Sequence, residues 1–259
     1  RKKRQKNEIT MDELNEKLTG GRIYKISQPE SDELLITVRN EKNQYKLMLS
    51  ADASLPLVYL TSESKEAPLT APAFCMLLRK YLQNARIISF EQPGMERIIR
   101  ITLEHLNELA DVCRKVLIIE IMGKHSNIIL TDEEGKIIDS IKRISGFVSS
   151  VREVLPGKEY FVPKTQDKKN PLLASKEDFL QKSEKMSIPV FKAIYGEYTG
   201  ISPLIAQNIC EKAGVDSRQD LPSLSNSQKE DLWEAFSLCM YGVKTCSYSP
   251  AIYYEGGEP

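Results

Sequence analysis

The sequence predicts an α+β protein in which an antiparallel β-rich domain precedes a small all-α domain. Up to residue 143, short apolar runs of strand length alternate with turn residues, which is typical of an antiparallel meander. After Pro156–Gly157 the apolar residues recur at helical spacing. The 259 residues suffice for one large domain or two modest ones. No apolar run approaches the ~18 residues that a membrane span needs.

The first quarter of the chain predicts one helix followed by four strands. Residues 11–18 form an apolar stripe at helical spacing, and Gly20 and Gly21 end the predicted helix. Polar turns rich in Asn, Asp, Glu and Pro separate the strands that follow. These strands are predicted over residues 21–26, 34–38, 45–49 and 57–60.

A second helix is predicted to interrupt the strands over residues 74–82. Its apolar residues recur at helical spacing, and its polar face carries Arg79 and Lys80. Five more strands then complete the β-rich region, and the turn at residues 132–135 closes the last hairpin. They are predicted over residues 86–90, 97–103, 115–122, 126–130 and 136–140.

The change in pattern after residue 157 predicts the domain organisation. The β-rich domain spans residues 11–157, a linker with prolines and lysines spans 158–172, and a helical domain spans 173–245. Residues 246–259 are predicted to return to the β-rich domain with a strand at 251–254, and the chain looks cut at its end. Four helices are predicted over residues 176–182, 190–198, 203–213 and 227–241.

Composition and charge limit the classes of function. Hydrophobic residues make up 41% and charged residues 28%, which is ordinary for a globular protein. Five of the first six residues are basic, a run that we interpret as an expression remnant or the edge of a fragment, although a basic arm is the alternative. The other 253 residues carry 31 basic and 36 acidic side chains, a net charge of −5. A site for a polyanion must therefore be confined to one patch.

The cysteines and histidines predict neither a metal site nor a disulfide framework. The five cysteines form no C-x-x-C pair, and there are only two histidines, His105 and His125. An odd number of scattered thiols favours a reducing compartment, so we predict a cytoplasmic protein without metal or cofactor.

The segment Thr199–Gly200–Ile201–Ser202–Pro203 predicts a tight turn feeding a helix. Ser202 suits the N-cap and Pro203 the first helical position. The unpaired backbone N–H groups at the start of such a helix point outward, and their partial positive charge suits a phosphate. The pattern resembles the hairpin of helix-hairpin-helix nucleic-acid modules, with Ser202 where a second glycine is common. The alternative is an ordinary capped helix pair.

A second polar segment interrupts the strands at residues 120–127, with the sequence E-I-M-G-K-H-S-N. Its glycine permits a close backbone approach, while Lys124, Ser126 and Asn127 offer groups that hold phosphate or ribose oxygens. A strand connection with a solvated tip uses the same residue types. No neighbouring nucleophile or acid supports His125 as a catalytic base.

A third candidate is the pair Glu96–Arg97 at the entrance to a strand. Arg97 offers a planar fork to a phosphate or carboxylate, and the neighbouring carboxylate can fix it. Adjacent strand residues face opposite ways, so the two share a site only where a bulge or a strand end turns one of them. Ordinary surface charge is the alternative.

Together these motifs resemble one family, the NFACT-N domain with its helix-hairpin-helix insert. The family includes the fibronectin-binding proteins of the FbpA type, bacterial RqcH and the eukaryotic nuclear export mediator factor. The resemblance runs collinearly from residue 11 to 259, and M-G-K-H-S-N and F-C-M-L-L-R-K are its most specific parts. It is carried by residues 18–26, 74–82, 95–98, 120–127 and 200–203.

The resemblance implies a non-enzymatic role in ribosome-associated quality control. Members of the family bind the large ribosomal subunit carrying a stalled nascent chain and recruit a tRNA, alanyl-tRNA in bacteria, for untemplated C-terminal tailing. The family's coiled coil and C-terminal NFACT-R domain lie outside this sequence. A shared likeness to the N-terminal domain of formamidopyrimidine-DNA glycosylases implies a β-sandwich-like architecture.

The resemblance also implies a binding site, with two departures from the family pattern. Glu96 stands where an Asp is common before Arg97, and residues 1–10 replace a hydrophobic-Asp-Gly segment, so one expected polar residue is missing. We expect the remaining residues to gather into one pocket for ribose-phosphate. They are Arg79, Lys80, Glu96, Arg97, Lys124, His125, Ser126, Asn127, Gly200 and Ser202.

Two alternative functions stay open. A fibronectin- or fibrinogen-binding adhesin requires export, and the sequence shows no signal peptide or anchor. A DNA-glycosylase-like enzyme requires a nucleophilic amine and a placed general acid; those glycosylases use an N-terminal proline, which Arg1 cannot replace. We therefore predict a binding protein that is not an enzyme, and the sequence leaves its oligomeric state open.

Overall fold

The computed structural model describes residues 11–54, 56–93, 97–162, 168–181 and 187–244. These residues form two compact units, a β-rich unit that ends at residue 162 and a helical unit that begins at residue 168. The α+β fold class predicted from the sequence is confirmed. None of the helices described combines the length and the apolar character that crossing a bilayer requires.

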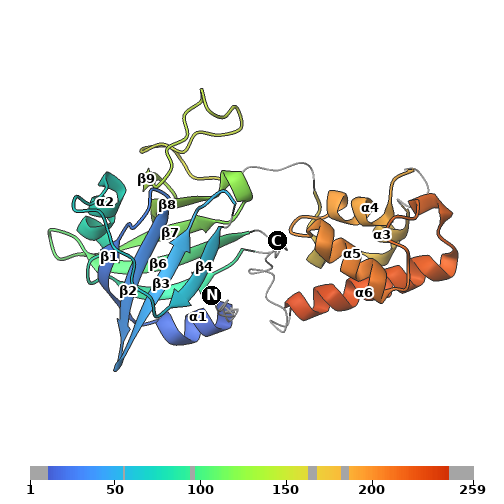
Figure 1. Cartoon of the computed structure of the whole chain (residues 1–259), viewed down its shortest axis with the longest axis horizontal. Helices are drawn as coiled ribbons and strands as arrows, with labels where there is room; N and C mark the ends of the chain where they lie inside the picture. The colour runs from blue at the N-terminus through green and yellow to red at the C-terminus, as the bar shows by residue number, and fades with distance from the viewer. Residues whose placement is uncertain (1–10, 55, 94–96, 163–167, 182–186, 245–259) are drawn as a thin grey trace. The chain divides into compact units, whose positions relative to one another are not determined.

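The first unit is built on one antiparallel sheet with the strand order β4-β3-β2-β1-β5-β6-β7-β8-β9. Each strand pairs with its neighbour in sequence, except where β1 meets β5, and Figure 1 follows this path from blue to green. The strands are β1 (Arg22–Ser27), β2 (Glu33–Asn40), β3 (Asn43–Ser50), β4 (Leu57–Thr61), β5 (Arg86–Glu91), β6 (Ile98–Leu106), β7 (Val112–Glu120), β8 (Asn127–Asp132) and β9 (Ile137–Ser140).

The sheet has two halves, β1–β4 and β5–β9, that join over a short stretch. Strands β1 and β5 share a single registered pair, Arg22 with Arg86, and register shifts interrupt β1 and β5 close to that junction. Gly21 lies at the same place, where an added Cβ would sit 2.7 Å from the Val38 side chain. A larger residue would therefore push β1 away from β2.

Two helices cover the sheet of the first unit. Helix α1 (Met11–Leu18) buries Leu14 and Leu18, and its Asn15 side chain exchanges two hydrogen bonds of 2.9 Å with the backbone of Phe90 in β5. Helix α2 (Ala73–Leu82) packs against β1, β6 and β9. Both lie close to the positions predicted from their apolar spacing.

The predicted linker is packed against both units over its described residues. The Tyr160 N–H donates to the carbonyl of Gly135 at 2.8 Å, which places residues 158–162 on the β8–β9 hairpin. On the other side, the Lys169 N–H donates to the carbonyl of Glu197 at 2.8 Å. Residues 163–167 and the predicted return segment at 246–259 lie outside the described residues.

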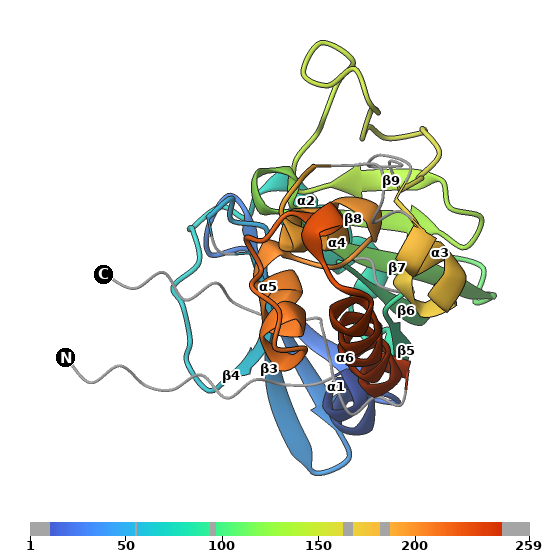
Figure 2. The same ribbon diagram turned by 90° about the vertical axis from the view of Figure 1, so that its right-hand side faces the viewer.

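The second unit is helical (Figures 1 and 2). It has its own apolar core. Phe236 lies at its centre, with ring centroids 4.8 Å from Phe179, 4.9 Å from Tyr198 and 5.8 Å from Trp233. The helices are α3 (Lys176–Gln181), α4 (Val190–Glu197), α5 (Pro203–Lys212) and α6 (Asn226–Lys244), with 3-10 turns at Pro171–Leu173 and Leu221–Ser223.

Replacing Phe236 tests this core. We expect Phe236→Ala to lower the free energy of unfolding of the second unit by about 3–5 kcal/mol, since it removes a buried ring and leaves a cavity. Trp233 is the one tryptophan of the sequence, so its fluorescence during urea unfolding follows this unit. The matched control, Leu173→Ala on an exposed turn, should change the stability by less than ~0.5 kcal/mol. Equal midpoints for the two variants would contradict the packing described.

Candidate nucleic-acid interface

Two of the predicted polar motifs, the entrance to β6 and the connection from β7 to β8, lie together at one end of the sheet, here called the motif end. It is the end where Ile98 of β6, Glu120 of β7 and Asn127 of β8 lie side by side in register. The pairing continues beyond the strands, since the Ile121 N–H donates to the carbonyl of Arg97 at 2.8 Å. Arg97 is thereby placed beside the connection from β7 to β8.

That connection is a short 3-10 turn, η1 (Gly123–His125), with a fixed backbone. The Met122 N–H donates to Ser126 Oγ at 2.8 Å, and the Ser126 N–H donates to the carbonyl of Gly123 at 3.0 Å. Gly123 has a φ of +57°, which a residue with a Cβ adopts only with strain. The turn consequently presents Lys124 and His125, both exposed, from a rigid base.

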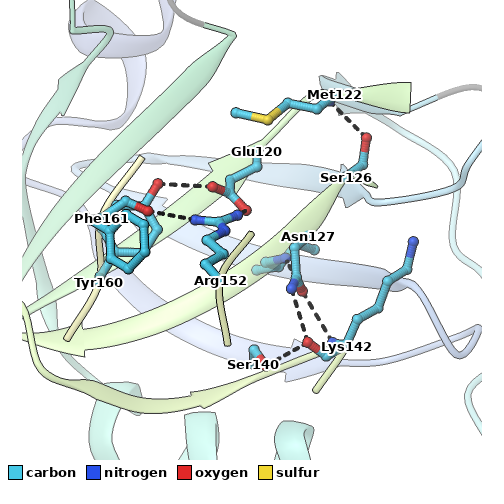
Figure 3. Close-up of polar contacts among 10 residues, drawn as sticks. Glu120, Met122, Ser126, Asn127, Ser140, Lys142, Arg152, Tyr160 and Phe161 are labelled. Atoms are coloured by element: carbon cyan, nitrogen blue, oxygen red, sulfur yellow. Dashed lines mark hydrogen bonds and ion pairs between the residues drawn. The ribbon is translucent and has the colours of Figure 1, made fainter. Parts of the chain in front are cut away.

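Ser126 and Asn127 are buried and bond within the protein (Figure 3). Asn127 Oδ1 accepts from the N–H groups of Ile128 and Lys142, at 2.9 and 3.1 Å, and Asn127 Nδ2 donates to the carbonyl of Lys142 at 2.9 Å. The side chain thus ties the start of β8 to the segment after β9. The sequence predicted both residues as direct ligands of phosphate or ribose; their geometry favours a role in positioning the turn.

Lys142 connects the motif end to the other half of the sheet. Its Nζ donates to the carbonyl of Ala51, which directly follows β3. An added Cβ on Gly123 would likewise lie 4.0 Å from the carbonyl oxygen of Ala53. The loop after β3 therefore packs beside η1, and both halves of the sheet contribute to this surface.

A buried ionic network lies beneath the motif end (Figure 3). The Glu120 carboxylate is fully buried and pairs with the guanidinium of Arg152, while Tyr160 Oη donates to Glu120 Oε2 at 3.0 Å. Arg152 also donates to the carbonyl of Phe161 at 2.7 Å. Burial, reinforced by the negative charge of Glu120, raises the pKa of Tyr160, so the phenol stays protonated as a donor.

The exposed cations of the motif end give the surface its chemistry. Arg97 and Lys124 are exposed cations on backbone held by the bonds described above, and guanidinium and ammonium groups both suit a phosphodiester. The exposed His125 ring follows Lys124 on the same turn. Arg143 lies further along the segment after β9 and is committed to a bidentate pair with Asp139, at 2.9 and 3.0 Å.

The remaining predicted residues lie elsewhere. On α2, Arg79 Nε donates to the carbonyl of Ile26 at 2.8 Å, and Lys80 Nζ lies 5.2 Å from the ring centroid of Tyr81. Tyr81 packs against His105, which lies eight strand residues from Arg97, or about 26 Å at the rise of a β-strand. The structure therefore separates Lys80 from Lys124, and the two cannot share one phosphate.

The predicted turn of the second unit has the expected local geometry. Gly200 has a φ of +78°, and Ser202 is the N-cap of α5, with Oγ accepting from the Ile205 N–H at 3.2 Å. Pro203 begins the helix, as the sequence predicts. Gly200 and Ser202 belong to the second unit, so their role is assessed separately from the motif end. Glu96 lies outside the described residues.

Sequence reasoning missed Arg152, Tyr160 and Lys142 as residues that support the site. Arg152 lies 32 residues and Tyr160 40 residues beyond Glu120, so no local pattern joins them. One signal was present: Glu120 ends the apolar run of residues 116–119. A carboxylate in such a strand is buried, and it requires a cation and a second hydrogen-bond donor.

The chain belongs to the family of NFACT N-terminal and middle domains, whose family model matches residues 8–259. It is 42% identical over 211 residues to the Rqc2 homolog RqcH of Bacillus subtilis, covering 81% of this chain and 37% of that protein. The RqcH of Streptococcus pneumoniae D39 is 34% identical over 255 residues, covering 96% of this chain and 44% of that protein. The chain thus spans less than half the length of these relatives.

Solved structures of similar sequence have the same fold. The fibrinogen-binding protein of Staphylococcus aureus superposes with a TM-score of 0.73 at 33% identity, covering 91% of this chain and 80% of that one. The N-terminal domain of the fibronectin-binding protein PavA of Streptococcus pneumoniae superposes with a TM-score of 0.68 at 36% identity, covering 77% and 74%.

Breaking the buried network should destabilise the first unit. We expect Glu120→Gln to lower the free energy of unfolding by about 3–5 kcal/mol, because the Arg152 guanidinium is left buried without a counter-charge. The additional change Arg152→Met should recover part of this loss, since it removes that charge. Urea unfolding followed by far-UV circular dichroism measures both variants.

The control for the buried pair is an exposed one. Lys158→Gln removes the partner of Glu153 in a solvent-exposed salt bridge of 3.0 Å, so its midpoint should match that of the unmodified protein. If Glu120→Gln unfolds at the same urea concentration as Lys158→Gln, the buried network does not support the motif end.

The raised pKa of Tyr160 predicts a loss of stability in alkali. Because the folded pKa exceeds the unfolded value of about 10, stability is complete below that pH and falls as pH rises through the interval between the two values. Tyr160→Phe should lose stability less steeply above about pH 10 in urea titrations, whereas below that pH the two proteins should show the same slope. The exposed control Tyr24→Phe should keep the original slope; equal slopes for both variants would refute the assignment.

Proposed function

We propose that this chain is the RNA-binding part of a ribosome-associated quality control factor. In this role it holds a tRNA on a large ribosomal subunit that carries a stalled nascent chain. The tRNA is alanyl-tRNA, delivered for untemplated C-terminal tailing. Membership of the NFACT family supports the proposal, as do the relatives named RqcH at 42% and 34% identity.

The observation that carries the proposal is the exposed cation set at the motif end. Its cations are Lys124, which the turn η1 presents beside His125, and Arg97, which lies beside that turn; Ser126 and Gly123 fix the backbone of the turn. Preorganised cations bind phosphates without the entropic cost of ordering a loop. On a body with a net charge of −5 outside residues 1–6, such a patch draws a polyanion to one place.

The proposed role is binding and positioning, with the bond-forming chemistry left to the ribosome. Phosphate contacts at the motif end fix the register of the tRNA, and the N-terminus of α5 behind Gly200 and Ser202 offers backbone donors to another phosphate. The four described cysteines are free thiols, as expected in the cytoplasm, where we place this activity.

The motif end can be tested by removing two cations together. The variant Arg97→Ala/Lys124→Ala should bind tRNA at least about a hundredfold more weakly, since each of the two charged hydrogen bonds contributes roughly 1.5–3 kcal/mol. The slope of log affinity against log salt should also become shallower by about 1 to 2. Filter binding at several salt concentrations, with alanyl-tRNA and uncharged tRNA compared, measures both quantities.

A matched double variant controls for charge. Lys17→Ala/Lys42→Ala removes two exposed cations from α1 and from the β2–β3 turn, the opposite end of that hairpin from Ala51. It should leave the tRNA affinity and salt slope close to those of the unmodified chain. Equal losses in the two double variants would show that net charge governs binding, and the motif end would no longer be the site.

Binding of fibronectin or fibrinogen is a second candidate function, because the similar solved structures are described as fibronectin- and fibrinogen-binding proteins. Immobilised fibronectin and fibrinogen at physiological salt, with tRNA as competitor, separate the two functions. Retention that persists in excess tRNA and in Arg97→Ala/Lys124→Ala favours matrix binding. Retention that tRNA abolishes favours the RNA site.

A further inference from the structure

The tip of the β6–β7 hairpin exposes three large apolar side chains. Leu106 and Val112 face each other as the last cross-strand pair, with exposed fractions of 64% and 65%, and Leu109 in the connecting loop is 82% exposed. Single exposed leucines are ordinary, but three within seven residues on one protruding turn form an apolar knob. Leu106, Leu109 and Val112 are called the hairpin knob below.

The loop that carries the hairpin knob is rigid. Asn107 Oδ1 accepts from the N–H groups of Leu109 and Asp111, both at 2.9 Å, and the backbone N–H of Asn107 donates to the carbonyl of Asp111 at 2.9 Å. The Ala110 N–H donates to the carbonyl of Asn107 at 3.0 Å, and Ala110 holds a φ of +62°. A non-glycine residue in the left-handed region is retained only when its surroundings fix it.

The charge of the loop itself, over residues 106–112, selects the kind of partner; the cations Lys80 and Lys115 lie around Tyr81, which packs against His105. Residues 106–112 carry two exposed carboxylates, Glu108 and Asp111, and no cation. The nearest arginine along β7, Arg114, is 3.5 Å from the carboxylate of Glu104. Carboxylates repel RNA phosphates, whereas they complement lysines and arginines around an apolar pocket of a protein.

The hairpin knob lies at the opposite end of β6 from the motif end. Arg97 precedes β6, Leu106 ends it, and the nine residues of the strand span roughly 30 Å. The motif end therefore presents cations, and the hairpin knob, a strand length away, presents apolar and acidic groups. The first surface suits RNA and the second suits a protein.

We propose that the hairpin knob docks into an apolar pocket with a basic rim on a protein of the large ribosomal subunit. This inference rests on the proposed ribosomal function and adds a protein contact to it. Leu109 is the central anchor, Leu106 and Val112 flank it, and Glu108 and Asp111 pair with the cations of the rim. Three side chains bury a small area, so the contact orients the chain while RNA contacts supply much of the affinity.

Substitution of the central anchor tests the docking. The 259-residue chain is titrated with purified bacterial large ribosomal subunits, and separately with the ribosomal RNA extracted from them. Leu109→Ser should weaken binding to intact subunits by about tenfold, as expected for an anchor side chain, and leave binding to the extracted RNA unchanged. The control Leu69→Ser, at another fully exposed leucine, should change neither.

The outcomes separate this inference from the proposed function. If the unmodified chain binds neither intact subunits nor RNA, the ribosomal function fails and the inference fails with it. If it binds intact subunits and Leu109→Ser binds them equally well, the inference alone is overturned. Far-UV circular dichroism of Leu109→Ser should match that of the unmodified chain, because the Leu109 side chain is exposed and Asn107 Oδ1 accepts from its backbone N–H, which the substitution retains.

Reversing a charge distinguishes the partners by the sign of the effect. Glu108→Lys should weaken binding to intact subunits if the rim is basic protein, and strengthen it if the knob faces RNA phosphates. Stronger binding overturns the proposal in favour of RNA. Sedimentation of the chain alone gives a further check, since a dimer that Leu109→Ser dissolves would assign the knob to a second copy and also overturn the proposal.

Discussion

The burial of one carboxylate, Glu120, governs the architecture of the motif end. A charge without solvent demands a counter-charge and full hydrogen bonding, and Arg152 and Tyr160 supply both from the segment after β9. Because Glu120 is the last residue of β7, satisfying it fixes where β7 ends and where η1 begins. The position of the exposed cations thus depends on an ion pair whose carboxylate is fully buried.

Roles are divided between neighbouring residues of one short segment. Ser126 and Asn127 direct their polar atoms inward and determine the path of the backbone, whereas Lys124 and His125 direct theirs outward. A hydroxyl or amide that bonds within the protein is unavailable to a ligand, yet it holds the ligand-facing groups at a constant spacing. Replacing an inward residue and replacing an outward one should therefore have different signatures, loss of stability in the first case and loss of affinity in the second.

The sequence predicted most of the fold because periodicity is local. The nine strands, α1, α2 and the cap of α5 by Ser202 follow from spacing within a few residues. The partners of Glu120 could not be predicted in this way, because Arg152 and Tyr160 lie 32 and 40 residues further along the chain and meet Glu120 only in the folded protein. The distance between Lys80 and Lys124 was also beyond local reasoning, because spacing identifies the polar face of α2 without placing that helix on the sheet. Glu96 and residues 246–259 lie outside the described residues, so predictions for them stay predictions.

The strand order of the sheet has a consequence for how the chain reaches its native state. Every pairing except β1 with β5 joins strands that are consecutive in sequence, so each half can assemble by successive hairpins at a small loop-closure cost. The β1–β5 junction is the exception: it closes a loop that contains three strands and α2. Its one registered pair, Arg22 with Arg86, is flanked by four backbone hydrogen bonds of 2.8–2.9 Å between residues 20–23 and 84–87. Joining the halves is thus the strand pairing of highest contact order in this unit, and it should form more slowly than the hairpins on either side of it.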